Sequence, residues 1–299
     1  MCRLAAYLGE PLFLEELIAK PRHSLMRQSL RAVEGHVQTN GDGFGIGWYG
    51  DRAEPGVYRE VMPAWSDDNL LALSQTLSSH LFFAHVRAAT AGGIARQNCH
   101  PFRHGRHLFM HNGQIGGYAQ LRRKMETRLP EALYAERRGA TDSELLFLLA
   151  LARMHAGAAP AEAMLSVVDD TMALMQQHGI TQPLRFAAVL SDGEQLLAFR
   201  IASDRQPPTL YLRQTRMGTT VASEPLSEAV SDGHNSGSSD STHDGTRDGS
   251  PAAGAWRMLP NGAVVTVTRG QCDVRIHSPL RAPVVATGAM ATDNSAQAA

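Results

Sequence analysis

Short apolar runs bounded by turn residues constrain the fold of this chain most. Runs of this kind, too short for helices and rich in β-branched and aromatic residues, predict buried β-strands. The sequence Ser191-Asp192-Gly193 separates two of them and is typical of a turn that joins antiparallel strands in a hairpin. The predicted strands are 44–49, 81–86, 186–190, 196–199, 219–222 and 262–268.

Four longer segments predict helices, at 67–78, 117–128, 142–155 and 160–178. The third begins after Thr141, an N-cap residue, with Glu144 three positions on, which is the spacing of a capping box. The fourth ends at Gly179. Because the strands pair as hairpins and do not alternate strictly with helices, we expect an α+β fold with antiparallel sheets covered by helices, and not a doubly wound parallel sheet.

Composition and charge exclude several classes of protein. Lys and Arg number 28 against 29 Asp and Glu, so the net charge is −1, which argues against electrostatic binding to nucleic acid or an anionic membrane. No apolar run approaches the roughly 18 residues of a membrane span. The residues after Met1 lack the pattern of a secretory signal. We therefore expect a cytoplasmic protein with neither nucleic acid nor membrane as partner.

Composition also divides the chain. The segment 231–250 contains no apolar residue and consists mostly of Ser, Gly and Asp, so it cannot offset its ordering entropy by burial. We expect one domain over 1–280 with a flexible insertion at about 228–254. The small, polar segment 281–299 predicts a disordered tail.

Cys2 follows the initiator Met directly, and this position matters more than the cysteine count. Removal of Met1 would leave a thiol and a free α-amine on one residue. Since an α-amine titrates near pH 8, it can act as a general base toward its own side chain. The alternative is a small apolar residue on a first strand. The three cysteines Cys2, Cys99 and Cys272 are too few for a disulfide framework.

Five segments, in this order, resemble the class II glutamine amidotransferases, the N-terminal-nucleophile branch that takes ammonia from glutamine. They are Met1-Cys2-Arg3, 40–48 (NGDGFGIGW), 85–90 (HVRAAT), His111-Asn112-Gly113 and 141–144 (TDSE). The resemblance covers about 1–226 and resumes in 255–277. It implies a four-layer αββα sandwich of two antiparallel sheets, the N-terminal-nucleophile hydrolase fold.

The resemblance also implies residue roles. Cys2 would attack the γ-carbonyl of glutamine or a γ-glutamyl amide, giving a thioester. Asn112, through its amide, and Gly113, through its backbone N–H, would hold the oxyanion. Arg87 would fork onto the substrate α-carboxylate, Asp142 would hold the α-ammonium, and Thr90 would line the pocket. Without that context, Asn112-Gly113 fits a turn after a strand, Arg87 a surface arginine and Asp142 a helix-dipole partner.

Departures from the family pattern favour its stand-alone branch. Ala88 and Ala91 stand where synthase-linked amidotransferases usually carry Trp and His, and the remaining chain is too short for a synthase domain. The segments 21–25, 65–67 and 86–90 are similar to the amidohydrolases of ergothioneine biosynthesis, which hydrolyse γ-glutamyl-hercynylcysteine sulfoxide. Two alternatives are a subunit supplying ammonia to a separate synthase and a non-catalytic binding protein on the same fold.

A second cluster, rich in histidine, raises the question of a metal. Cys99, His100, His104, His107 and His111 lie close together in sequence. Pro101 breaks any helix that would align them, and their neighbours predict loop and strand, so we expect no metal site. The resemblance implies no metal and no organic cofactor.

Overall fold

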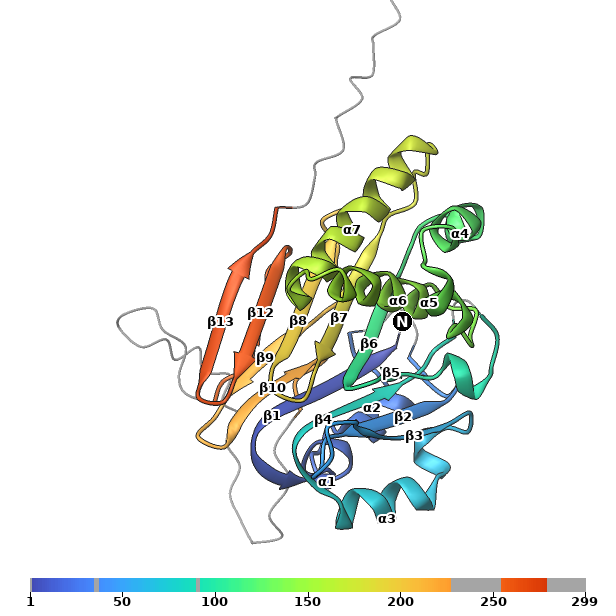
Figure 1. The fold of residues 1–299 in the computed structure, drawn as a ribbon. Helices are drawn as coiled ribbons and strands as arrows, with labels where there is room; N and C mark the ends of the chain where they lie inside the picture. Colours follow the sequence, from blue (N-terminus) through green and yellow to red (C-terminus); the bar gives the residue numbers. More distant parts are fainter. Residues whose placement is uncertain (1, 35–37, 90–91, 227–253, 279–299) are drawn as a thin grey trace, which may run out of the picture.

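Two antiparallel β-sheets stack face to face between two layers of helices (Figure 1). The computed structural model describes residues 2–34, 38–89, 92–226 and 254–278. The predicted α+β class and the four-layer αββα arrangement are confirmed.

The first sheet has the strand order β11-β9-β10-β1-β4-β2-β3. Its central strand, β1, pairs with β4 on one side and β10 on the other, so the start of the chain lies in the middle of the sheet. Its strands are β1 (Arg3–Phe13), β2 (Phe44–Trp48), β3 (Gly56–Glu60), β4 (Ser78–Val86), β9 (Tyr211–Gln214), β10 (Gly218–Ala222) and β11 (Arg257–Met258).

The second sheet has the order β13-β12-β8-β7-β6-β5. β7 and β8 form the hairpin predicted around Asp192. Its strands are β5 (Phe102–His104), β6 (His107–Gln114), β7 (Arg185–Ser191), β8 (Leu196–Ala202), β12 (Ala263–Thr268) and β13 (Gln271–Ile276).

Helices cover the outer face of each sheet (Figure 1). Those packed on the first sheet are α1 (Glu15–Ile18), α2 (Leu25–Leu30) and α3 (Asp68–Thr76). Those packed on the second are α4 (Tyr118–Glu126), α5 (Glu131–Ala135), α6 (Asp142–His155) and α7 (Pro160–Gln177).

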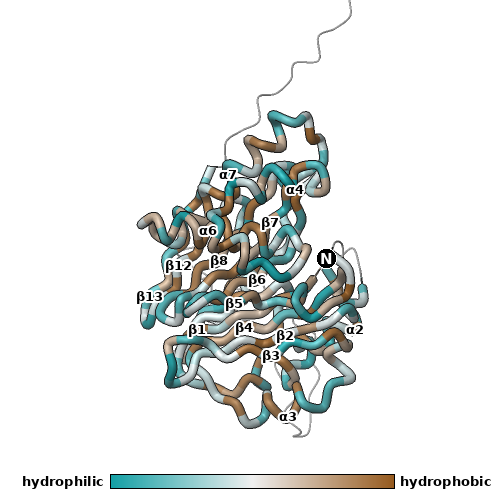
Figure 2. The backbone as a smooth tube through the Cα atoms, turned by 45° about the vertical axis from the view of Figure 1, so that its right-hand side comes forward, coloured by the Kyte–Doolittle hydropathy of each residue, from teal (hydrophilic) through white to brown (hydrophobic). Residues whose placement is uncertain are grey.

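Alternation along the strands separates three apolar layers. On β1, Leu4, Ala6 and Leu8 belong to the core between the sheets, whereas Ala5 and Tyr7 belong to the core beneath α1–α3. A third layer lies between the second sheet and α4–α7. Figure 2 shows hydrophobic residues concentrated where α6 and α7 cover β7, β8 and β12. A shift of one residue in the pairing of a strand would move its apolar side chains to the other face of the sheet. Burial of these side chains therefore fixes the strand register.

The predicted helix boundaries agree with the structure to within two or three residues. Thr141 is the N-cap of α6 and accepts the N–H of Glu144 at 3.2 Å. The other half of the predicted capping box is not made, because the Glu144 carboxylate accepts the N–H groups of Arg138 and Gly139. Gly179 follows α7 with φ +62°, as a C-terminal glycine should.

Several elements and expectations differ from the sequence-based picture. Ten elements are missing from the predicted ranges: the strands β1, β3, β5, β6, β9, β11 and β13 and the helices α1, α2 and α5. β1 and β6 are long and largely buried, whereas the others are short or largely exposed. The predicted insertion over about 228–254, Gly254 apart, lies outside the described residues. The predicted tail 281–299 and Thr90 also lie outside them.

Candidate active site

Strand periodicity brings Cys2 and Arg87 to the same end of the first sheet. Arg3 pairs with Val86, so the register places Cys2 across from Arg87. Since Leu4 faces the second sheet, Cys2, two residues earlier, projects from the same face. Both candidate residues therefore stand at the rim of the core between the sheets.

The Cys2 thiol lies against the main chain that follows β4. Its Sγ atom is 3.4 Å from the Ala88 nitrogen and 3.5 Å from the Ala88 oxygen. Burial raises the pKa of Cys2, and the Ala88 N–H and the charges of Arg87 and Arg3 offset only part of that effect. The thiol is therefore protonated near neutral pH and needs a base before it can attack.

Arg87 is 3% exposed, and its main chain is fixed on both sides. Its N–H donates to Gly43 O at 2.8 Å, and its carbonyl accepts the N–H of Asp42 at 3.0 Å. The Asp42 carboxylate in turn accepts the N–H of Ala89 at 2.8 Å. A loop held this way presents a buried guanidinium beside the thiol, which suits recognition of a carboxylate.

Asn112 lies on β6 with its amide buried. It follows Leu108 and Met110 by alternation, and these contribute to the core between the sheets, so Asn112 faces the first sheet. Its side chain is 0% exposed, and neither the amide nitrogen nor the oxygen has a hydrogen-bond partner among the described residues. Leaving such a group unsatisfied costs about 1–3 kcal/mol, so its presence here suits a donor that awaits a ligand.

Gly113 continues β6, opposite Phe186 of β7. The turn that Asn112-Gly113 could have formed is absent, because both residues lie inside this strand. A Cβ atom at position 113 would lie 1.9 Å from the Arg185 carbonyl oxygen, so no larger residue fits without moving β7. The alternative of a turn is therefore wrong for this pair.

Asp142 is the first residue of α6, is 8% exposed, and connects that helix to the end of β6. Its Oδ2 accepts the N–H of Ile115 at 3.0 Å, and its Oδ1 accepts the N–H of Ser143 at 2.8 Å. Ile115 follows the last residue of β6. The carboxylate thus lies at the end of the strand that carries Asn112 and Gly113.

The rings of two buried histidines, His85 and His100, contact each other in a tilted arrangement that was not predicted. Their ring centroids are 4.3 Å apart, and no ring nitrogen of either has a hydrogen-bond partner in the described part of the chain. Burial lowers the pKa of His85 to about 3 and that of His100 well below its usual value, so both are neutral. The charges of Arg87 and His111 also act on the pKa of His85, so this histidine lies near Arg87 of the first sheet and near His111, which precedes Asn112 on the second sheet. In the sequence, the only indication that His85 belongs to the site was its position two residues before Arg87.

The glycines of β2 make room for His100. A Cβ at Gly45 would lie 2.2 Å from the His100 carbonyl oxygen, and one at Gly47 would lie 2.8 Å from Pro101. The segment 99–101 therefore crosses the sheet over alternate glycines and carries the His100 ring against His85. Of the remaining histidines of the sequence cluster, His104 on β5 and His107 on β6 are opposite each other, and His111 lies further along β6.

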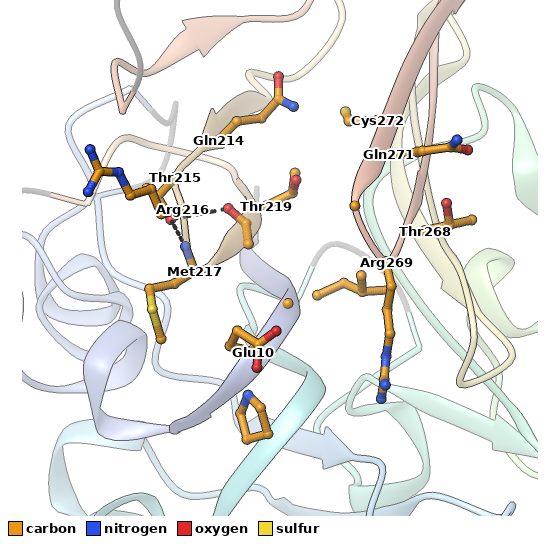
Figure 3. A pocket seen from close by; sticks show the side chains of 15 residues that line it. Glu10, Gln214, Thr215, Arg216, Met217, Thr219, Thr268, Arg269, Gln271 and Cys272 are labelled. Carbon is orange, nitrogen blue, oxygen red and sulfur yellow. Dashed lines mark hydrogen bonds between the residues drawn. The ribbon is translucent and has the colours of Figure 1, made fainter.

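A cavity of about 340 Å³ lies at the opposite end of β1 from Cys2. Figure 3 shows it between the β9–β10 turn and the β12–β13 turn, with Glu10, Thr219 and Arg269 among its lining residues. Because Cys2 and Arg87 are at the other end of the strand, this cavity is separate from the candidate active site.

Among the described residues, no helix is both long and apolar enough to cross a membrane.

Comparison with solved structures identifies the fold. A glutamine aminotransferase class-II domain protein from Silicibacter pomeroyi is 33% identical, and the match covers 93% of this chain and 100% of that one with a TM-score of 0.67. The glutamine phosphoribosylpyrophosphate amidotransferase of B. subtilis has the same fold at 13% identity, with a TM-score of 0.56 over 92% of this chain and 49% of its own.

Sequence relatives point the same way. The chain is 36% identical over 160 residues to "Probable glutamine amidotransferase DUG3" of Saccharomyces cerevisiae, covering 50% of this chain and 45% of that protein. It is 30% identical over 189 residues to the γ-glutamyl-hercynylcysteine sulfoxide hydrolase of Mycolicibacterium smegmatis, covering 59% of this chain and 83% of that protein. The chain thus spans less than half the length of the yeast relative. The family model of class-II glutamine amidotransferases matches residues 19–286, so the chain belongs to the class-II glutamine amidotransferase family, as its motifs predicted.

Proposed function

We propose that this protein hydrolyses the γ-glutamyl amide bond of glutamine or of a γ-glutamyl conjugate through a thioester on Cys2. The observation that carries this proposal is the placement of the Cys2 thiol across from Arg87 on one sheet and of the buried Asn112 amide, which has no hydrogen-bond partner among the described residues, on the facing sheet. Membership in the class-II amidotransferase family supports the same chemistry.

In the proposed reaction, the α-amine exposed by removal of Met1 takes the proton from the Cys2 thiol. The sulfur attacks the γ-carbonyl carbon, and Asn112 and the Gly113 N–H stabilise the oxyanion that forms. The intermediate collapses, the C–N bond breaks, and the leaving amine takes the proton from the α-ammonium. Water, deprotonated by the same amine, then attacks the thioester. The C–S bond breaks to release glutamate, and the Cys2 sulfur takes the proton back from the α-ammonium, which restores the thiol and the free amine.

Substrate recognition is assigned to Arg87 for the α-carboxylate and Asp142 for the α-ammonium, with Thr90 lining the pocket. A cation and an anion that each bind one charge of the substrate favour a ligand that carries both charges over one that lacks either. Arg87 follows β4, which pairs with the strand that Cys2 precedes, and Asp142 on α6 accepts the N–H of Ile115 at the end of the strand that carries the proposed oxyanion donors.

The leaving amine distinguishes two candidate substrates, glutamine and a γ-glutamyl conjugate of a larger amine. The relative that supports a conjugate, the γ-glutamyl-hercynylcysteine sulfoxide hydrolase, is matched over 83% of its length. A panel of γ-glutamyl amides, with released glutamate as the readout, separates them. Preference for glutamine, stimulated by an added synthase, indicates ammonia supply, whereas slow glutamine turnover with rapid cleavage of a bulky amide indicates a conjugate hydrolase.

The pH dependence of kcat/KM should report the α-amine. A general base must be unprotonated, so the rate should rise as pH increases through about 8, the usual range of an α-amine, and be lost as pH falls. Burial raises the pKa of the Cys2 thiol, so thiol ionisation should not produce the rise. Initial rates between pH 5.5 and 9.5 check this, and a rate already at its plateau at pH 6 would contradict an amine base.

Replacing Arg87 with lysine should raise KM for glutamine by about tenfold to a hundredfold, with a smaller change in kcat, because lysine keeps the charge but loses the fork. The matched control is Arg269→Lys beside the distant cavity, which should leave both constants unchanged. 4-Aminobutanamide, which is glutamine without its α-carboxylate, should be equally poor for the parent and for Arg87→Lys. If Arg87→Lys discriminates the two amides as well as the parent does, Arg87 does not read the carboxylate.

A further inference from the structure

A buried ion pair lies at the residue that follows the proposed nucleophile; its two atoms are close, although the Arg3 Nε has no hydrogen-bond geometry among the described residues. The Arg3 Nε atom is 2.9 Å from the Glu224 Oε1 atom, and both side chains are 1% exposed. Burial lowers the pKa of Arg3 and the Glu224 charge opposes that shift, so the guanidinium stays charged. By strand alternation Arg3 points to the helix side of the first sheet, away from Cys2.

Glu224 is also held by the segment that follows α2. Its carboxylate accepts the N–H of Val33 at 3.0 Å and the N–H of Glu34 at 2.9 Å, and its Oε2 is 2.6 Å from His23 Nε2. These hydrogen bonds lower the pKa of Glu224 against the opposing effect of burial, so it is ionised. One carboxylate thus joins three segments that are distant in sequence.

Main-chain hydrogen bonds next to this ion pair hold the start of β1. Leu4 exchanges two hydrogen bonds with Ser223, its N–H donating to Ser223 Oγ at 3.0 Å and its carbonyl accepting the Ser223 N–H at 2.9 Å. On the other side, Arg3 and Leu4 pair with Val86 and His85 of β4. The start of β1 is therefore held from both sides, and on the β10 side Arg3 also pairs with Glu224.

Strand ends fray unless something ties them down, and here the end carries the nucleophile. After removal of Met1, only Cys2 would precede Arg3. A sulfur displaced by about 1 Å can lose about 100-fold in rate without loss of substrate binding.

We propose that Glu224 is a positioning residue for the Cys2 nucleophile and acts through Arg3. This inference rests on the proposed function only for the kinetic test, because the hydrogen-exchange test does not require a substrate. The alternative is that the ion pair serves only stability, and a buried ion pair is a poor device for that purpose, since apolar replacements of similar volume are often as stable or more stable.

The first test replaces Glu224 with glutamine in the full chain. Amide hydrogen exchange should become about tenfold faster at Arg3 and Leu4, because the strand start loses its anchor. With the amide substrate found above, kcat should fall by about 100-fold while KM, set by residues on β4 and α6, stays within about threefold. Asp170→Asn, which removes the ion pair between Arg153 and Asp170 on α6 and α7, is the matched control and should change neither readout.

Two further variants separate positioning from stability. Arg3→Met combined with Glu224→Gln removes both charges and keeps an acceptor for the Val33 and Glu34 N–H groups, so its melting temperature should recover relative to Glu224→Gln alone while kcat stays low. Arg3→Lys keeps the charge but lacks the Nε atom that contacts Glu224 Oε1, so it should show the same loss of kcat. This variant is the test to use if Glu224→Gln does not fold.

The outcomes are distinct. Recovery of kcat together with melting temperature in the double variant, or unchanged exchange at Arg3 and Leu4 in the single variants, overturns the proposal. A parent protein that hydrolyses no γ-glutamyl amide defeats the proposed function, and the exchange measurement then still decides whether Glu224 anchors the strand start.

Discussion

Replacing Cys2 with alanine is expected to abolish γ-glutamyl amide hydrolysis, lowering kcat by at least about 10⁴-fold. No other thiol can take over, because Cys99 is 0% exposed and Cys272 lies on β13, at the far edge of the second sheet. The variant should fold normally, since the hydrogen bonds of the sulfur among the described residues are to the main chain of Ala88 and a small side chain replaces it. Glutamate release measures the loss, and thermal unfolding verifies the fold.

Covalent labelling sharpens this prediction. 6-Diazo-5-oxo-norleucine, a glutamine-like electrophile, should add once to the parent and not to Cys2→Ala, as intact mass shows. Cys99→Ala is the matched control and should label like the parent, because its buried thiol lies against Glu60 O and Ala95 O. Equal labelling of Cys2→Ala and the parent would place the nucleophile elsewhere.

The same mass spectrum tests the base. Protein that retains Met1 has an amide where the proposed base must be, so it should neither turn over substrate nor react quickly with the electrophile. Because burial raises the pKa of the thiol, little thiolate is available to replace that base. Full activity in Met1-bearing protein would exclude the α-amine mechanism.

Local patterns were sufficient to predict much of the architecture. The boundaries of α6 and α7 followed from Thr141 and Gly179, and the β7–β8 hairpin followed from the turn at Asp192. These signals are local in sequence, and the structure preserves them because tertiary packing agrees with them. The end of β4 at Val86, which puts Arg87 at the rim of the core, also followed from a local pattern.

The parts that could not be predicted depend on which strands become neighbours. Asn112-Gly113 is a good turn sequence, yet it continues β6 because β7 pairs with it through Gln114. His85 and His100 meet only because glycines on β2 let 99–101 cross the sheet. Glu224 reaches Arg3 only because β10 is the neighbour of β1. Pairings between distant segments leave no periodic signal in one sequence, so these contacts had to come from the structure.

Replacing Asn112 with alanine is expected to lower kcat by about 10²–10³-fold, the usual cost of one oxyanion donor, with KM changed little. The amide would act only once the carbonyl oxygen has become an oxyanion, so substrate binding should survive its loss. Asn112→Asp is the matched control: it keeps the shape but presents only acceptors when ionised, so it should be no more active than alanine. Steady-state kinetics of glutamate release on both variants give the comparison.

The stability of Asn112→Ala should distinguish a catalytic amide from a structural one. Neither polar atom of Asn112 has a hydrogen-bond partner among the described residues, so its removal leaves no group there unsatisfied. The melting temperature should therefore stay within a few degrees of the parent or rise, in contrast to the loss that follows when a hydrogen-bonded buried amide is removed. A large fall in melting temperature with proportional loss of activity would mean that Asn112 supports the core, and that the oxyanion is held by other donors.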